Sequence, residues 1–177
     1  GSLLEYLKFN MGNLQIEQFR ILFLNKKNSL IADEIMATGT IDQTPVYPRE
    51  IIKRILVHEA GAIILVHNHP SGNLEPSEGD KVVTDRLIQA CKIMQIDIED
   101  HLIITERSYY SFQFSGLMDE LRKSKRFVPA YEQKRQFEEQ LAEEIEKRGV
   151  KKNQKEIVLR MRSEGCDIET IMRFTGL

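Results

Sequence analysis

The sequence contains no tryptophan and only two cysteines among its 177 residues. Cys91 and Cys166 lie far apart and belong to no Cys-x-x-Cys pattern. Isolated cysteines of this kind are typical of reduced thiols in the cytoplasm, whereas small secreted proteins pair theirs in disulfides. We therefore expect a cytoplasmic protein whose fold does not depend on a disulfide.

Long hydrophobic runs are also missing. The longest, residues 62–66, has the length of a strand, whereas a membrane helix needs roughly 18 to 20 apolar residues. The sequence shows no secretory signal, and we expect no membrane partner. The chain opens with Gly1-Ser2 instead of Met, which indicates an expression scar or a fragment from which an N-terminal domain is missing.

An excess of charge of one sign is absent as well, because 25 basic residues are balanced by 27 acidic ones and the formal net charge is −2. This balance argues against binding of nucleic acid by the whole surface, although it leaves a local basic patch open. A composition of 41% hydrophobic and 29% charged residues is that of a soluble globular protein, here one domain and an appendage.

Hydrophobic periodicity predicts an α/β domain. The expected elements are strands at 19–27 and 28–41 joined by a turn at 26–29, a helix at 48–61, an apolar strand at 62–66, a helix at 77–95, a strand at 96–105 and an edge strand at 108–116. The order β-β-α-β-α-β-β implies a mixed β-sheet with helices packed on it.

The pattern changes after residue 118, so we expect one domain at 10–118 and a helical C-terminal extension at 119–177. In the extension we expect a charged helix at 131–149, ended by Gly149, and a helix-turn-helix-like pair at 156–164 and 168–174. Its mixed charge leaves open a packing or homodimerising role and a contact with nucleic acid. The basic residues available for that contact are Lys151, Lys152, Lys155, Arg160 and Arg162.

The chemistry is concentrated in residues 66–80, "VHNHPSGNLEPSEGD". His67 and His69 end the apolar strand and face the same side of it, because strand side chains alternate. Asp80, in the first turn of the following helix, completes a set of three ligands. A site with three protein ligands keeps a fourth position open for water, as catalytic zinc sites do. Ser77 is expected to cap the helix that carries Asp80.

This pattern, His67-x-His69-Pro70 followed by Ser77-x-x-Asp80, matches the JAMM motif of the JAB/MPN metalloproteases. The segments "HNHPSG", "PSEGD", "DHLIIT" and "YYSF" resemble its RadC-type branch over roughly residues 10–117. The resemblance implies a cytidine-deaminase-like fold, an α/β sandwich with helices on both faces of the sheet. It also implies zinc (Zn2+) on His67, His69 and Asp80, and an oxyanion stabilised by Ser77.

The resemblance also implies a general base, a glutamate at or before the first strand. Glu17 precedes the apolar strand "FRILFL", and we favour it; Glu34, on the second strand, is the alternative. His58, late in its helix, and His101, after Asp100, lie outside the motif. We expect a structural role for His58. For His101 a structural role and a role in supporting the metal ligands are both open, and we favour the structural one. Zinc deaminases have a related fold but need a His-x-Glu and a Pro-Cys-x-x-Cys segment. The chain has neither segment, so we do not expect a deaminase.

Two functions follow from this pattern. The first is a zinc-dependent metallohydrolase that cleaves a peptide or isopeptide bond in a peptide or protein substrate. The second is a non-catalytic RadC-like module, associated with DNA repair or mobile elements, in which the metal site is structural or vestigial. The three-ligand set favours the first, since structural zinc sites are usually closed by four protein ligands.

Overall fold

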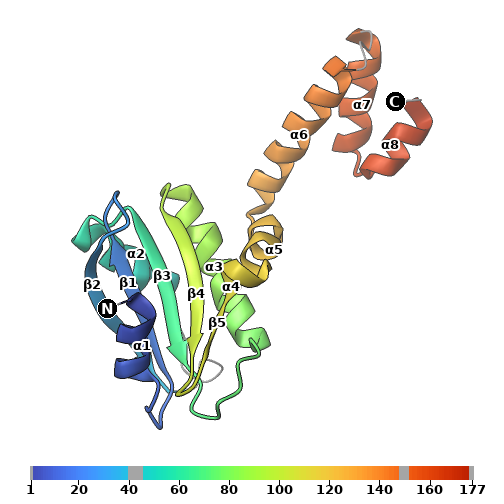
Figure 1. The fold of residues 1–177 in the computed structure, drawn as a ribbon. Coiled ribbons are helices and arrows are strands. Elements are labelled where there is room, and N and C mark those ends of the chain that lie inside the picture. Colours follow the sequence, from blue (N-terminus) through green and yellow to red (C-terminus); the bar gives the residue numbers. More distant parts are fainter. Residues whose placement is uncertain (1, 40–45, 148–151, 176–177) are drawn as a thin grey trace. The chain divides into compact units, whose positions relative to one another are not determined.

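The computed structural model describes residues 2–39, 46–147 and 152–175. Its centre is a five-stranded mixed sheet in the order β2-β1-β3-β4-β5, with helices on both faces (Figure 1). The strands are β1 Gln18–Leu24, β2 Leu30–Thr38, β3 Ala62–Asn68, β4 Asp97–Ile104 and β5 Tyr109–Ser111. The helices of this part are α1 Leu3–Met11, α2 Pro48–His58, α3 Glu78–Ile93, α4 Phe112–Ser115 and α5 Leu117–Lys123. The predicted α/β fold is confirmed.

The pairing of the strands places β3 at the middle of the sheet. β1 pairs antiparallel with both β2 and β3, whereas β3 and β4 are parallel and end at the same edge (Figure 1). An apolar strand is typical of this central position, where both faces are covered. The site residues that follow β3 therefore lie at the carboxyl edge of a β-α-β unit, where α/β proteins commonly bind ligands.

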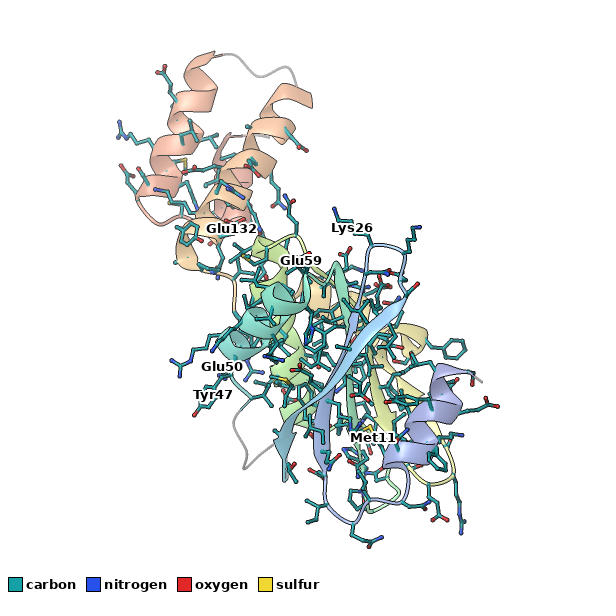
Figure 2. All side chains as sticks on the ribbon, turned by 90° about the vertical axis from the view of Figure 1, so that its left-hand side faces the viewer. Met11, Lys26, Tyr47, Glu50, Glu59 and Glu132 are labelled. Carbon is teal, nitrogen blue, oxygen red and sulfur yellow. The ribbon has the colours of Figure 1, made fainter. Side chains whose placement is uncertain are left out.

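The two faces of the sheet are covered by different helices. On one face Phe19, Ile21 and Phe23 of β1 belong to a buried core with side chains of α2 and α3. On the other, Leu22 and Val66 belong to a smaller core that includes residues of α1. Figure 2 shows this division, with α2, beside the labels of Glu50 and Glu59, on one side and α1 with Met11 on the other.

Two elements differ from the sequence prediction. Helix α1 was not expected, although Ser2 and Glu5 form a capping box, a recognisable start signal for a helix. The expected edge strand at 108–116 is wrong beyond Ser111. The Ser111 hydroxyl accepts a hydrogen bond from the Phe114 amide and so caps the short helix α4 in place of a continued strand. Of the expected strand at 28–41, residues 40 and 41 lie outside the described residues.

Contacts along the chain divide it into two units, Gly1–Phe127 and Val128–Leu177. Helix α5, whose Met118 is fully buried in the main core, belongs to the first unit. The domain boundary at 118/119 stays a prediction.

The second unit contains α6 Ala130–Lys147, α7 Lys152–Ser163 and α8 Ile168–Thr175. Its small core is formed by Leu141, Val158 and Ile171. The expected end of a helix at Gly149 lies outside the described residues. No helix in the described part of the chain is long and apolar enough to cross a membrane.

Candidate metal centre

The loop between β3 and α3 brings the motif residues together. His67 lies near the end of β3, and His69 follows it while its amide donates to the Ile104 carbonyl of β4 at 2.9 Å. The Gly72 amide then donates to the His69 carbonyl at 3.0 Å, in a turn with a φ of +77° at Gly72 that suits glycine. The turn reverses the chain, so that α3 begins beside the end of β3 and presents Asp80 to the histidines.

His67, His69 and Asp80 form the one group of potential metal ligands among the residues that the structure describes. His67 Nε2 lies 2.9 Å from His69 Nε2 and 3.2 Å from Asp80 Oδ1, and His69 Nε2 lies 3.7 Å from Asp80 Oδ2. Ligands held about 2.0–2.2 Å from a zinc ion lie roughly 3.3 Å apart in a tetrahedron. The three measured separations bracket this value, so the residues fit a tetrahedral cation.

The hydrogen bonds of His69 show why its Nε2 is available. Its other ring nitrogen, Nδ1, lies 2.7 Å from the Asn73 carbonyl oxygen. A carbonyl can only accept, so Nδ1 carries the hydrogen and Nε2 keeps its lone pair. Metal-binding histidines are commonly oriented in this way by an acceptor on the far ring nitrogen.

Asp80 is held as an anion. Burial alone would raise its pKa, but the contacts with His67 and Ser77 hold the pKa of the Asp80 carboxyl well below its usual value. The amide and the hydroxyl of Ser77 both donate to Asp80 Oδ2, each at 2.8 Å. The predicted capping role of Ser77 is confirmed, and the cap orients a ligand as well as starting a helix.

Glu17 immediately precedes β1 and is half-buried. Its carbonyl accepts from the Gly39 amide at 2.8 Å, which extends the β1–β2 pairing by one step. Phe19 pairs with His67 across β1 and β3. If the alternation of β1 side chains continues by one residue beyond Gln18, Glu17 is on the same face as Phe19 and His67.

Asn68, between the two histidines, fixes the backbone on either side of Glu17. Its Oδ1 accepts from the Gln18 amide at 2.8 Å, and its Nδ2 donates to the Ile16 carbonyl at 3.2 Å. The side chain is 1% exposed. A residue inside the metal motif therefore anchors the segment that carries the candidate base, a link that the sequence pattern did not predict.

Glu34 is engaged elsewhere. Its carboxylate accepts from Arg54 Nε at 2.6 Å, pairs also with Arg54 Nη2, and lies 2.7 Å from His58 Nε2. These hydrogen bonds, that of Arg54 foremost, lower the pKa of Glu34 to about 2 despite its partial burial. A carboxylate with so low a pKa is a weak proton acceptor near neutral pH. The structural role expected for His58 agrees with this ion-pair cluster, which joins β2 to α2.

His101 is completely buried and touches the site. Its Nε2 lies 2.8 Å from His67 Nδ1, and its Nδ1 lies 2.6 Å from the Thr84 hydroxyl. Burial lowers the pKa of His101 well below its usual value, so the ring is neutral. The sequence analysis favoured a structural role for His101 over the alternative of supporting a metal ligand, and the contact with His67 agrees with that alternative. Since β3 and β4 are adjacent and parallel, the pairing of Leu65 with His101 was the signal that could have revealed it.

Comparisons with known proteins agree with this geometry. The sequence profile of the "RadC-like JAB domain" family matches residues 1–117. The UPF0758 protein YeeS of Escherichia coli (strain K12) is 49% identical over 114 residues, which cover 64% of this chain and 77% of that protein. The UPF0758 protein YkfG of the same organism is 48% identical over 114 residues, 64% of this chain and 72% of the relative. A UPF0758 protein of Rhodobacter capsulatus is 48% identical over 117 residues, 66% of this chain and 55% of the relative.

Proposed function

This chain belongs to the family of RadC-like JAB domains, and from this premise we propose that it is a zinc-dependent metallohydrolase of the JAMM type. Its substrate is a peptide or protein, in which it hydrolyses a peptide or isopeptide bond. One observation carries the proposal: two imidazole nitrogens and one carboxylate converge with separations that suit a tetrahedral cation. Three protein ligands leave one position for water or substrate.

The ligand types support zinc as the metal. Two neutral imidazoles and one carboxylate form a set known from catalytic zinc sites, whereas calcium and magnesium prefer oxygen ligands throughout. When bound, zinc supplies a Lewis acid that polarises a carbonyl and lowers the pKa of a coordinated water. The other steps belong to side chains of the protein.

Glu17 is the proposed general base. It directly precedes β1, whose Phe19 pairs with His67, and Asn68 holds the backbone on both sides of it. In this role its carboxylate accepts a proton from the attacking water and passes it to the leaving amine. Because Glu34 is bound by Arg54 and His58, its carboxylate is a poor acceptor for this proton.

Ser77 is the proposed donor to the oxyanion. Its hydroxyl donates to Asp80 Oδ2, and rotation about its Cβ–Oγ bond would redirect that hydrogen to an oxyanion that forms beside the metal. The Ser77 amide also donates to Asp80 Oδ2, so Asp80 keeps one hydrogen bond while the hydroxyl turns. Oxyanion donors of this kind commonly contribute on the order of 10²-fold or more to rate.

A cleavage screen tests the function. Zinc-loaded wild-type protein and a His67→Ala/His69→Ala variant are incubated with a mixed peptide library and with peptides joined through lysine ε-amides, and new termini are identified by mass spectrometry. We expect cleavage by the wild type alone. Equal cleavage by the two proteins, or none by zinc-loaded wild type in either library, would contradict the proposal and favour a non-catalytic module.

A further inference from the structure

A chain of hydrogen bonds runs from His67 into the core and back to the helix that carries Asp80. His67 Nδ1 meets His101 Nε2 at 2.8 Å, and His101 Nδ1 meets the Thr84 hydroxyl at 2.6 Å. The same hydroxyl donates to the backbone carbonyl of Asp80, one turn earlier in α3, at 2.6 Å. His67, His101 and Thr84 are each 0% exposed, so water does not compete for these bonds.

The direction of every hydrogen bond in this network follows from its last acceptor, the Asp80 carbonyl. The Asp80 carbonyl can only accept, so the Thr84 hydroxyl must give it its single hydrogen. That hydroxyl then accepts from His101 Nδ1–H. The His101 ring is fully buried, and its two nitrogens meet a hydroxyl and an imidazole and no carboxylate. A ring in such surroundings carries one hydrogen, so its Nε2 has a lone pair and accepts from His67 Nδ1–H.

The reverse direction is unfavourable. If His67 carried its hydrogen on Nε2, His101 would have to donate from Nε2 and the Thr84 hydroxyl would have to donate to His101 Nδ1. The Thr84 oxygen would then face the Asp80 carbonyl oxygen at 2.6 Å with no hydrogen between them. Two buried oxygens in such contact repel each other, so this direction is disfavoured.

We propose that Thr84 and His101 form a directional relay that fixes His67 as its Nδ1–H tautomer and so keeps His67 Nε2 free to bind the metal. Both are positioning residues, and the inference rests on the proposed metal site. The relay does for buried His67 what the Asn73 carbonyl does directly for His69. Such outer contacts of a metal-bound histidine are commonly worth roughly 10- to 100-fold in metal affinity.

The surroundings of His101 hold its ring in the orientation that the relay needs. The ring stacks on Phe112, with centroids 4.5 Å apart, and meets the edge of Phe19. Asp100 accepts hydrogen bonds from the His101 and Gln113 amides at 2.7 and 2.9 Å. Asp100 thereby ties β4 to α4, the short helix that supplies Phe112.

Thr84→Val tests the relay, because valine has nearly the shape of threonine and lacks only the hydroxyl. The affinity for zinc is measured by competition with a chelator. We expect Thr84→Val to bind zinc roughly 10- to 100-fold more weakly than wild type, and Thr84→Ser, which restores the hydroxyl, to recover most of the affinity. The matched control is Thr105→Val, since Thr105 is also a buried threonine but bonds only to Ser108; it should bind zinc as wild type does.

Nitrogen-15 NMR of the metal-free protein provides a second readout that does not depend on metal or substrate. In the wild type, His67 and His101 should both be Nδ1–H tautomers, and in Thr84→Val the His101 ring should lose its single tautomer. An Nε2–H form of either ring in the wild type would overturn the relay. Equal affinities for zinc in the wild type and in Thr84→Val would also overturn it. So would a loss of zinc affinity in Thr105→Val as large as that in Thr84→Val. Wild-type protein that binds no zinc would instead contradict the proposed function, and the NMR result would still decide the relay.

Discussion

Replacing His67 and His69 together with alanine should lower the zinc content from about one ion per chain to essentially none. In the proposed site the two imidazoles supply two of the three ligand atoms, and they are its nitrogen donors. Asp80 alone would remain, and a single carboxylate does not hold zinc against a chelating buffer. Elemental analysis after dialysis measures the content directly.

The control for this experiment is His58→Ala. His58 is a half-buried histidine outside the site, bound to Glu34, and its removal should leave the zinc content unchanged. Zinc should also raise the unfolding temperature of wild type and of His58→Ala, but not of the double variant, because a ligand stabilises only the state that binds it. Equal zinc in the wild type and the double variant would place the metal elsewhere.

Glu17→Gln should retain zinc and lose roughly 10²-fold or more in hydrolytic rate, the usual scale for loss of a general base. The amide has almost the same shape as the carboxylate but cannot accept a proton. The three ligand side chains remain in place, so the metal content should not change. Rates are measured on a substrate from the cleavage screen, with equal zinc loading of the two proteins.

Glu34→Gln is the matched control for Glu17→Gln. It removes the negative charge from the cluster with Arg54 and His58, so it should lower stability. The hydrolytic rate per folded molecule should stay near that of wild type. The reverse pattern, with a silent Glu17→Gln and a large loss in Glu34→Gln, would transfer the role of general base to Glu34.

The parts of the fold that the sequence predicted are those in which local pattern and tertiary environment agree. Residues 62–66 are apolar because β3 is covered on both faces, and the helical stripe at 77–95 faces the same core. At 108–116 the local signal was ambiguous, since an alternating aromatic pattern also suits a short helix capped by Ser111. Helix α1 was not predicted, although the capping box of Ser2 and Glu5 is a local start signal in the sequence.

The convergence of His67, His69 and Asp80 was predictable because it is local in sequence: the two histidines share one strand end, and Asp80 lies in the first turn of the next helix. The supporting contacts of His101, Thr84 and Asn68 were not, because they depend on which strands become neighbours. His101 reaches His67 only because β4 lies parallel beside β3, and Asn68 reaches the Glu17 segment only because β1 lies on the other side.

The choice between Glu17 and Glu34 likewise depends on tertiary contacts, which the sequence does not show. Glu17 precedes β1 and Glu34 lies in β2, two strands of the same sheet. The sequence alone does not show what each carboxylate contacts. The structure shows that Glu34 pairs with Arg54 and His58 of α2. This engagement strengthens the proposal for Glu17 by removing its competitor.

X-ray absorption at the zinc K-edge, on wild-type protein carrying one zinc per chain, tests the central claim of an open metal site most directly. We predict about four nitrogen or oxygen ligands near 2.0–2.2 Å, with the outer-shell scattering of two imidazoles and no sulfur at about 2.3 Å. The fourth ligand should be an exchangeable water, replaced when a zinc-binding hydroxamate is added. A sulfur ligand, or a four-ligand shell that hydroxamate leaves unchanged, would show a closed structural site and contradict the proposed hydrolase.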